Sequence, residues 1–417
     1  MTAPETATFL RVFGRIGLYS FGGPAAQIAL MHRELVDENR WLTEKDFLGA
    51  LSFCMLLPGP EAMQLATFAG WRLRGVPGGL IAGLLFVLPG AAVMFALATG
   101  YALYGNIPLV EAAFLGVQAT VVAIVLEALF KVSKRALKQW DHWLLAALAF
   151  LAIFAFHLPF PLILAIAALW GFATTRPGKS ADAPVHIAPK TLRTVLIWLA
   201  LWAAPIAALI ALDAPLLTDI ALFFSKLAVV TFGGAYAVLA YMTQTVVSDF
   251  GWISTEQMMD GLGLAETTPG PLILVTQFVG FQAAYQQFGL GTAYLAGAIT
   301  LWVTFVPCFL WIFAGAPFVD RLTANNRLSG ALAAITACVV GVILNLSLWF
   351  AAHVVFQTIE TARFGPISII APDLATLNPI AAGIAAIGAA MLLIAHAGLG
   401  RTLITGAVLG LCAGLIF

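Results

Sequence analysis

Charged residues are scarce in this chain. Only 10% of its 417 residues are Asp, Glu, Lys or Arg, whereas a soluble domain of this size carries about 25%. Hydrophobic residues make up 61%, and apolar runs such as 77–104 exceed the ~20 residues that a membrane-spanning helix needs. The sequence therefore excludes a soluble globular domain and predicts an all-α polytopic membrane protein.

Several signals of other protein classes are also missing. The chain has no HExxH zinc motif, no Walker A sequence and no Ser/His or paired-Asp constellation inside its apolar runs, so we expect neither an enzyme nor direct drive by ATP. Lys and Arg balance Asp and Glu at 20 each, which gives no sign of a nucleic-acid partner. We expect no metal and no cofactor. The first dozen residues lack the apolar core of a cleavable signal peptide.

Cysteine is rare too, and the spacing of the cysteines does not indicate a disulfide framework or a metal site. Four cysteines lie in apolar segments without CxxC or paired spacing: Cys54, Cys308, Cys338 and Cys412. Packing is therefore the expected role, rather than metal binding or disulfide formation.

What the sequence does contain is an internal repeat. The stretch "RIGLYSFGGPAAQ" returns as "KLAVVTFGGAYAV", so that position 15 maps to 226 and position 22 to 233, an offset of 211 residues. At the same offset "RWLTEKDF" (40–47) meets "GWISTEQM" (251–258), and Pro-Gly-Pro at 58–60 meets Pro-Gly-Pro at 269–271. Internal repeats of this kind are typical of transporters.

The repeat divides the chain into two halves. We predict a first repeat over 1–175, a second over 214–417, and between them 176–213, a polar linker followed by a connecting transmembrane helix at 194–212. The expected elements are 8–31, 46–71, 76–103, 107–130, 141–157, 159–175, 218–247, 257–284, 288–316, 328–351, 378–396 and 398–417.

The first two elements of each half are broken at mid-length by glycine and proline. If each folds back as a re-entrant hairpin, nearly all Lys and Arg residues in loops face one compartment, which the positive-inside rule makes the cytoplasm. The extra crossing at 194–212 then inverts the second repeat, with the N-terminus inside and the C-terminus outside. Full spans in place of hairpins give the same parity of crossings, so the choice between the two rests on the charge count.

The broken backbone predicts an anion site. Irregular backbone at membrane depth is tolerated where it lines a cavity, and a half-helix that begins there directs unpaired N–H groups and its positive dipole end at a ligand. The candidate binding glycines are Gly22, Gly23, Gly59, Gly233, Gly234 and Gly270. Tight helix crossing is the alternative role for these glycines.

Two cations lie within the broken elements at the same repeat position. Arg15 and Lys226 are candidates to neutralise a dianion, because a cation inside an apolar element is costly; snorkelling to the surface is the alternative. Gln64 and Gln277 are candidates to donate hydrogen bonds to an oxyanion or, alternatively, to bridge helices.

Few acids are available for coupling to protons. Glu61 directly follows the first Pro-Gly-Pro, and Glu266 lies three residues before the second. Both are candidate proton-coupling groups, since a cavity wall is where desolvation and nearby cations shift the protonation of a carboxyl group. For Glu61, capping of its half-helix is the alternative.

These residues together resemble the chromate ion transporter (CHR) family of bacterial membrane proteins, in its two-domain form. "FGGP" at 21–24, "RWLTEKDF" at 40–47 and "PGPEAMQ" at 58–64 carry the resemblance, with "FGG" and "PGP" repeated in the second half. The second half departs from the pattern at Ala235 and Leu272, which stand where the first half has Pro24 and Glu61.

The resemblance implies export of chromate, driven by the membrane potential or a proton gradient, which gives chromate resistance. Sulfate is the related tetrahedral dianion and an alternative substrate, and an uncoupled anion channel is an alternative mechanism. The implied location is the bacterial inner membrane, with the lipid bilayer as surroundings; a homodimer is a further possibility.

Overall fold

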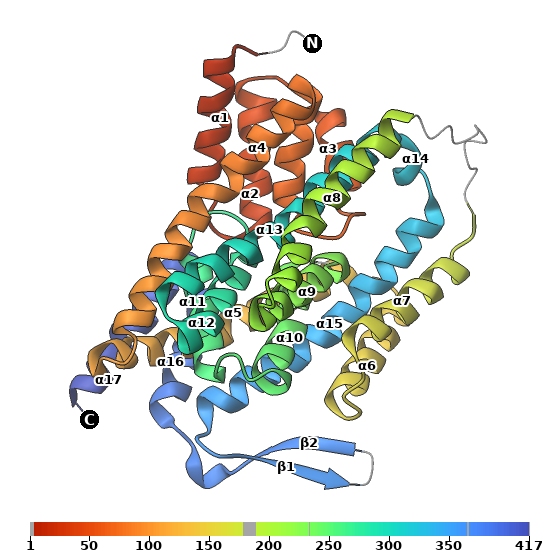
Figure 1. Ribbon diagram of the computed structural model, residues 1–417. Helices are drawn as coiled ribbons and strands as arrows, with labels where there is room; N and C mark the ends of the chain where they lie inside the picture. The colour runs from red at the N-terminus through yellow and green to blue at the C-terminus, as the bar shows by residue number, and fades with distance from the viewer. Residues whose placement is uncertain (1–3, 178–188, 233, 365–366, 417) are drawn as a thin grey trace. The chain divides into compact units, whose positions relative to one another are not determined.

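Helices dominate the computed structural model of the protein, which describes residues 4–177, 189–232, 234–364 and 367–416 (Figure 1). Within that part of the chain six segments are long and apolar enough to cross a membrane: Glu61–Tyr104, Pro108–Ala136, Thr191–Ala211, Leu290–Thr323, Asn326–Val355 and Leu399–Ile416. The predicted class, an all-α polytopic membrane protein, is confirmed.

The elements follow one another in this order: α1 (Thr6–Leu18), α2 (Gly23–His32), η1 (Arg33–Glu38), α3 (Glu44–Cys54), α4 (Glu61–Tyr104), α5 (Pro108–Ala136), α6 (Trp140–Phe154), α7 (Phe160–Thr174), α8 (Pro189–Ala211), α9 (Pro215–Val230), α10 (Ala235–Thr243), η2 (Gln244–Asp249), α11 (Thr255–Thr267), η3 (Leu272–Leu274), α12 (Val275–Phe288), α13 (Leu290–Gly315), η4 (Ala316–Phe318), α14 (Val319–Thr323), α15 (Asn326–Val355), β1 (Ile359–Phe364), β2 (Ile367–Pro372), η5 (Leu374–Thr376), α16 (Pro379–Ala389), η6 (Ala390–Ile394) and α17 (Leu399–Ile416).

One element was not expected. The chain between α15 and α16 forms an antiparallel β-hairpin, in which Ile359 pairs with Pro372 and Phe364 with Ile367. Of the predicted linker, residues 178–188 lie outside the described part of the chain, while the predicted connecting helix is present as α8.

The chain packs into two units, and each unit draws on both predicted halves. Unit 1 contains residues 1–99, 175–235 and 267–329, and unit 2 contains 100–174, 236–266 and 330–417. The boundaries of the two sequence halves stay a prediction, because packing units and sequence repeats are different divisions of one chain.

All four predicted breaks in the helices are present. They fall at 19–22 between α1 and α2, 55–60 between α3 and α4, 231–234 between α9 and α10, and 268–271 between α11 and η3. The first break ends at Gly22 and the third at Gly234, and the other two contain Pro-Gly-Pro; glycine admits positive φ, and proline removes a helical N–H donor.

The long helix α4 is in fact two helices. Arg74 (φ −142°, ψ 22°) and Gly75 (φ 64°, ψ −159°) are non-helical, and a Cβ atom on Gly70 would overlap the carbonyl oxygen of Gly78. The chain therefore turns back at 74–75, which confirms the predicted division between 71 and 76. Gly289 (φ 77°) makes the corresponding turn between α12 and α13.

Three distant points of unit 1 lie together at one end. The ring of Trp41 stacks on Phe9 at 6.3 Å between centroids, and Arg74 donates a hydrogen bond from Nη1 to Thr6 Oγ1 at 2.7 Å. The start of α1, the loop after η1 and the turn inside α4 are thus neighbours (Figure 1). Each of the first two broken elements consequently folds back on itself rather than running straight through.

The broken segments of the two repeats are joined by matching hydrogen bonds inside unit 1. Gly59 N donates to Thr231 O, and Gly270 N donates to Ser20 O, both at 2.8 Å. Position 20 maps to 231 and 59 to 270 by the same 211-residue offset. Each Pro-Gly-Pro segment is therefore held by the residue that precedes the Phe-Gly-Gly segment of the other repeat.

Each Pro-Gly-Pro segment also packs closely against a long helix, α13 for the first segment and α4 for the second. A Cβ atom on Gly90 of α4 would overlap the carbonyl oxygen of Pro269, and a Cβ atom on Gly59 would lie 2.9 Å from Cys308 Sγ of α13. Pro89 and Pro307 precede these two contact residues within their helices. Small residues at 90 and 308 allow the close approach.

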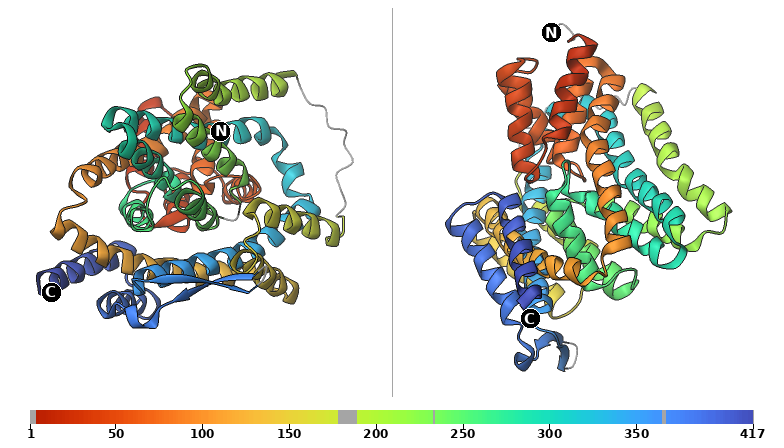
Figure 2. Two further views of the ribbon diagram at one scale, coloured as in Figure 1. Left: turned by 60° about the horizontal axis from the view of Figure 1, so that its bottom comes forward. Right: turned by 90° about the vertical axis from the view of Figure 1, so that its left-hand side faces the viewer.

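Unit 2 is held together by helix crossings at small residues. Gly116 of α5 lies against Gly406 and Gly410 of α17 so closely that a Cβ atom on any of the three would overlap backbone atoms of the facing helix. Beside this crossing Ile124, Leu392 and Leu403 pack in a buried cluster. Figure 2 shows α16 and α17 alongside α5.

Candidate functional site

Three of the breaks and the start of α2 line one cavity in unit 1. Its volume is about 20 Å³, and its lining residues are Pro24, Gln27, Gly59, Pro60, Glu61, Ala62, Thr231, Gly234, Ala235, Pro271, Leu272 and Ile273. A cavity of this size holds about one water molecule. The structure thus brings together segments more than 200 residues apart, packed closely around a small space.

Four helices begin at this cavity. Pro24 lies in the first turn of α2, Glu61 begins α4, Ala235 begins α10 and Leu272 begins η3. The first N–H groups of a helix have no intrahelical partner, and the helix dipole is positive at that end. Four helix starts therefore converge on this cavity.

The glycines that permit this geometry have left-handed backbone. The φ angles are 84° at Gly22, 79° at Gly23, 118° at Gly59, 105° at Gly234 and 92° at Gly270. Only glycine adopts such angles without strain. Gly59 and Gly234 line the cavity, whereas Gly22, Gly23 and Gly270 shape the adjoining backbone. Gly233, the remaining predicted glycine, lies outside the described residues.

Gln27 is a site residue that sequence reasoning missed. It is 1% exposed, lines the cavity, and its Nε2 donates to Gly270 O at 2.7 Å and to Ser20 O at 3.2 Å. Its amide therefore ties the first Phe-Gly-Gly segment to the second Pro-Gly-Pro segment. Position 27 maps to Val238 in the second repeat, so comparison of the two repeats could not identify Gln27 as a site residue.

The two predicted cations lie away from the cavity lining. Arg15 forms ion pairs with Glu34 and with Glu38, and its side chain is 46% exposed. Lys226 is an exposed residue of α9. Both cations belong to unit 1, and neither lines its cavity. The pairing of Arg15 with Glu34 was not expected from the sequence.

The two predicted glutamines are fully buried and each uses its amide nitrogen on the backbone. Gln64 Nε2 donates to Pro58 O at 2.6 Å, and Gln277 Nε2 donates to Ala91 O at 3.0 Å. Gln64 thereby fixes its own Pro-Gly-Pro loop, and Gln277 bridges α12 to α4. The Oε1 atoms of both side chains have no partner among the described residues.

Of the two predicted acids, one lies at the cavity. Glu61 begins α4 and lines the cavity wall. Glu266 belongs to unit 2, where its Oε1 accepts a hydrogen bond from Tyr236 Oη at 2.6 Å. A third acid, Asp260, was not singled out from the sequence; it is 3% exposed and accepts hydrogen bonds from Tyr101 and Gln118.

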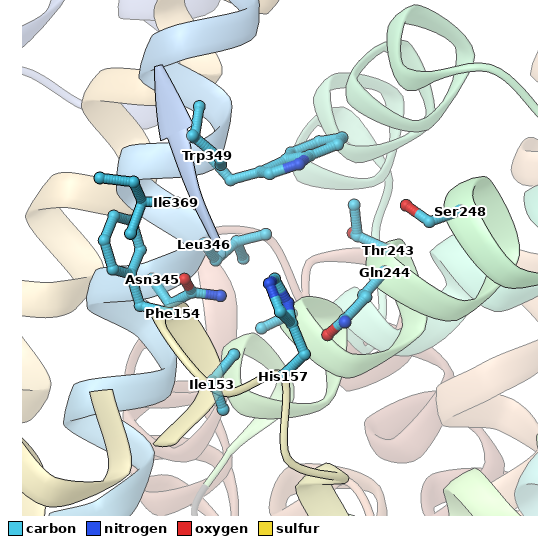
Figure 3. A pocket seen from close by; sticks show the side chains of 12 residues that line it. Ile153, Phe154, His157, Thr243, Gln244, Ser248, Asn345, Leu346, Trp349 and Ile369 are labelled. Atoms are coloured by element: carbon cyan, nitrogen blue, oxygen red, sulfur yellow. The ribbon is translucent and has the colours of Figure 1, made fainter. Parts of the chain in front are cut away.

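Unit 2 contains a larger cavity of about 260 Å³ (Figure 3). The side chains of His157, Thr243, Gln244, Asn345 and Trp349 surround its open space. Thr243 is 2% exposed, and its Oγ1 has no hydrogen-bond partner among the described residues. No Lys, Arg, Asp or Glu of the described chain lines this cavity.

Taken together, the fold and the cavity define a multi-pass helical membrane protein whose broken helices meet at one point. The family model for chromate transporters matches residues 7–172 and 218–415. The chain therefore belongs to the chromate transporter family, which is a family of transporters.

Three relatives are similar over about four fifths of both chains. A chromate transport protein of Pseudomonas aeruginosa is 35% identical, with 82% of this chain and 80% of the relative covered. A probable chromate transport protein of Synechococcus elongatus is 32% identical (79% and 81% covered). A chromate transport protein of Cupriavidus metallidurans is 29% identical (79% of each). No solved structure matches the chain.

Proposed function

We propose that the protein is a secondary active transporter that exports chromate across the bacterial inner membrane, driven by the membrane potential or a proton gradient, and so confers chromate resistance. The observation that carries the proposal is the convergence of four helix starts on one cavity in unit 1. Membership of the chromate transporter family and the names of the relatives support the substrate.

In this proposal the dianion is held by backbone rather than by a charged cage. The first-turn N–H groups of α2, α4, α10 and η3 donate to its oxygens, and the dipoles of these helices stabilise its charge. Arg15 and Lys226 raise the potential from farther away, and Glu61 is a candidate coupling group beside the site. Since the cavity is small, entry of a tetrahedral oxyanion requires the two Pro-Gly-Pro segments to move apart.

The deciding experiment uses the purified protein in liposomes. Labelled chromate should accumulate against its gradient when a membrane potential or pH gradient is imposed, and unlabelled sulfate should compete. Movement of chromate only down its own gradient, with a reversal potential independent of every other ion, would instead establish an uncoupled anion channel. Accumulation of sulfate without chromate would establish a sulfate carrier.

Neutralising the two repeat-related cations should reduce chromate transport strongly. Loss of one positive charge near a dianion removes favourable Coulomb energy of about 1 kcal/mol or more at a partly screened site, so Arg15→Ala and Lys226→Ala should each raise the KM of uptake by roughly fivefold or more. Arg11→Ala, which removes an exposed cation of the same helix as Arg15, is the matched control. Unchanged KM in both variants would exclude these cations from the site.

We also propose that the N-terminus is cytoplasmic and the C-terminus periplasmic, with inverted repeats. The neighbouring positions of Trp41 and Arg74 support hairpins that enter and leave on one side. Single cysteines at Glu38 and Arg72 should react with an impermeant thiol reagent only from the cytoplasm, and one at Asp249 only from outside. Labelling of positions 38 and 72 from opposite sides would contradict the hairpins.

We propose in addition that the protein forms a homodimer, which cross-linking in the membrane would detect.

A further inference from the structure

Asp260 is a buried carboxyl group to which no role has yet been given. It lies on α11, is 3% exposed, and receives a hydrogen bond on each oxygen. Tyr101 Oη donates to Oδ2 at 2.8 Å, and Gln118 Nε2 donates to Oδ1 at 2.9 Å. Tyr101 lies at the end of α4 and Gln118 lies on α5, so parts of three helices meet at one carboxyl group within unit 2.

Asp260 has no ion-pair partner in the part of the chain that the structure describes. Among the described residues no Lys or Arg forms an ion pair with it. Two acidic groups act on the cluster, Glu256 on α11 and Glu111 on α5, while His353 on α15 lies within the field of Glu256. A buried carboxylate without a cation is costly, and like charges add to that cost, whereas the neutral acid is tolerated.

The position of Asp260 in the chain is as informative as its burial. Position 260 maps by the 211-residue offset to Gly49, so only the second repeat carries an acid there. Asp260 lies about two helical turns before the end of α11, and the break that follows contains Gly270, whose N–H is bonded to Ser20 O. The α11 helix therefore joins Asp260 along the chain to the break that contains the second Pro-Gly-Pro segment.

We propose that Asp260 is the proton-binding site that couples proton movement to oxyanion transport. The proposal rests on the proposed function as a coupled chromate transporter. A proton taken from water on one side binds Oδ2, and the carboxyl O–H then donates to Tyr101 Oη, which changes from donor to acceptor. The bond between α4 and α11 is thereby rearranged, and release of the same proton on the other side restores it.

The test uses the full-length protein in liposomes, with chromate uptake under a pH gradient and chromate–chromate exchange without one. In Asp260→Asn the stimulation by the pH gradient should disappear, while exchange continues at a rate close to that of the unmodified protein. Glu256→Gln, which neutralises an exposed acid one turn earlier on the same helix, should keep the stimulation. Glu61→Gln and Glu266→Gln are run in parallel, and loss of the stimulation in only one of them would assign the proton to that carboxyl group instead.

A second variant separates a proton site from a merely structural carboxyl group. Tyr101→Phe leaves Asp260 in place but removes a donor that stabilises its ionised form, so the pH midpoint of uptake should move to higher pH. Infrared difference spectra after a pH jump should show a protonated carboxyl band that is absent in Asp260→Asn.

The outcomes can be told apart. Absence of chromate transport in the unmodified protein would refute the proposed function itself. Intact stimulation in Asp260→Asn, or its loss only in Glu266→Gln, would overturn the assignment of the proton to Asp260. An unaltered pH midpoint in Tyr101→Phe would do the same, including in the case that Asp260→Asn fails to fold.

Discussion

Gly90→Ala should destabilise unit 1 by about 1–3 kcal/mol, the usual cost of overpacking a close-packed interior. Gly90 is buried in α4, and an added Cβ atom would overlap the carbonyl oxygen of Pro269 and lie 2.6 Å from Leu274 Cδ1. Because Pro269 O is a backbone atom, the Pro-Gly-Pro segment itself must move. We expect a lower midpoint of thermal unfolding in detergent and a lower rate of chromate uptake.

Gly14→Ala is the matched control for this substitution. Gly14 lies in α1 of the same unit, and a Cβ atom there would have no atom within 4 Å. Alanine is favoured over glycine inside a helix by up to about 1 kcal/mol, so this variant should be as stable as the unmodified protein or slightly more so. Equal unfolding midpoints for the two variants would show that α4 and the second Pro-Gly-Pro segment are not in tight contact.

The helices and their breaks could be predicted from the sequence because they depend on the residues of each segment itself. Apolar length predicts the spans, and Phe-Gly-Gly and Pro-Gly-Pro predict the breaks, since positive φ and missing N–H groups act on the residue that carries them. The β-hairpin 359–372 was missed: this stretch follows a long apolar helix, and strand pairing depends on register between two segments rather than on either segment alone.

The candidate site could be predicted from the sequence only in part. The repeat offset identified which segments meet, and Ser20 and Thr231 could have been found in the same way, because they hold matching positions before the two Phe-Gly-Gly segments. Side-chain partners were not accessible. The pairing of Arg15 with Glu34 and the burial of Asp260 depend on how helices pack, for which the sequence carries no spacing rule.

Substitution of Gly23 or Gly234 by alanine should lower chromate affinity nearly as much as substitution by valine. A Cβ atom would have no atom within 4 Å at either position, so space is not what glycine provides here. The φ angles of 79° and 105° are the constraint, and an L-residue in left-handed backbone costs roughly 1–2 kcal/mol. If that strain relaxes by displacing the starts of α2 and α10, chromate affinity should fall by about five- to thirtyfold in every one of these variants.

Asparagine separates backbone strain from other causes of the loss. Asn tolerates left-handed backbone near φ ≈ +57° better than other L-residues, so Gly23→Asn should recover much of the affinity that Gly23→Ala loses. Gly234 lies farther from that region, and Gly234→Asn should recover little. Gly49→Ala, at an open position in α3 without positive φ, is the control and should leave the KM of chromate uptake unchanged. Unaltered affinity in both Gly23→Val and Gly234→Val would mean that the helix starts do not hold the anion, because each substitution must alter the backbone from which the N–H groups point.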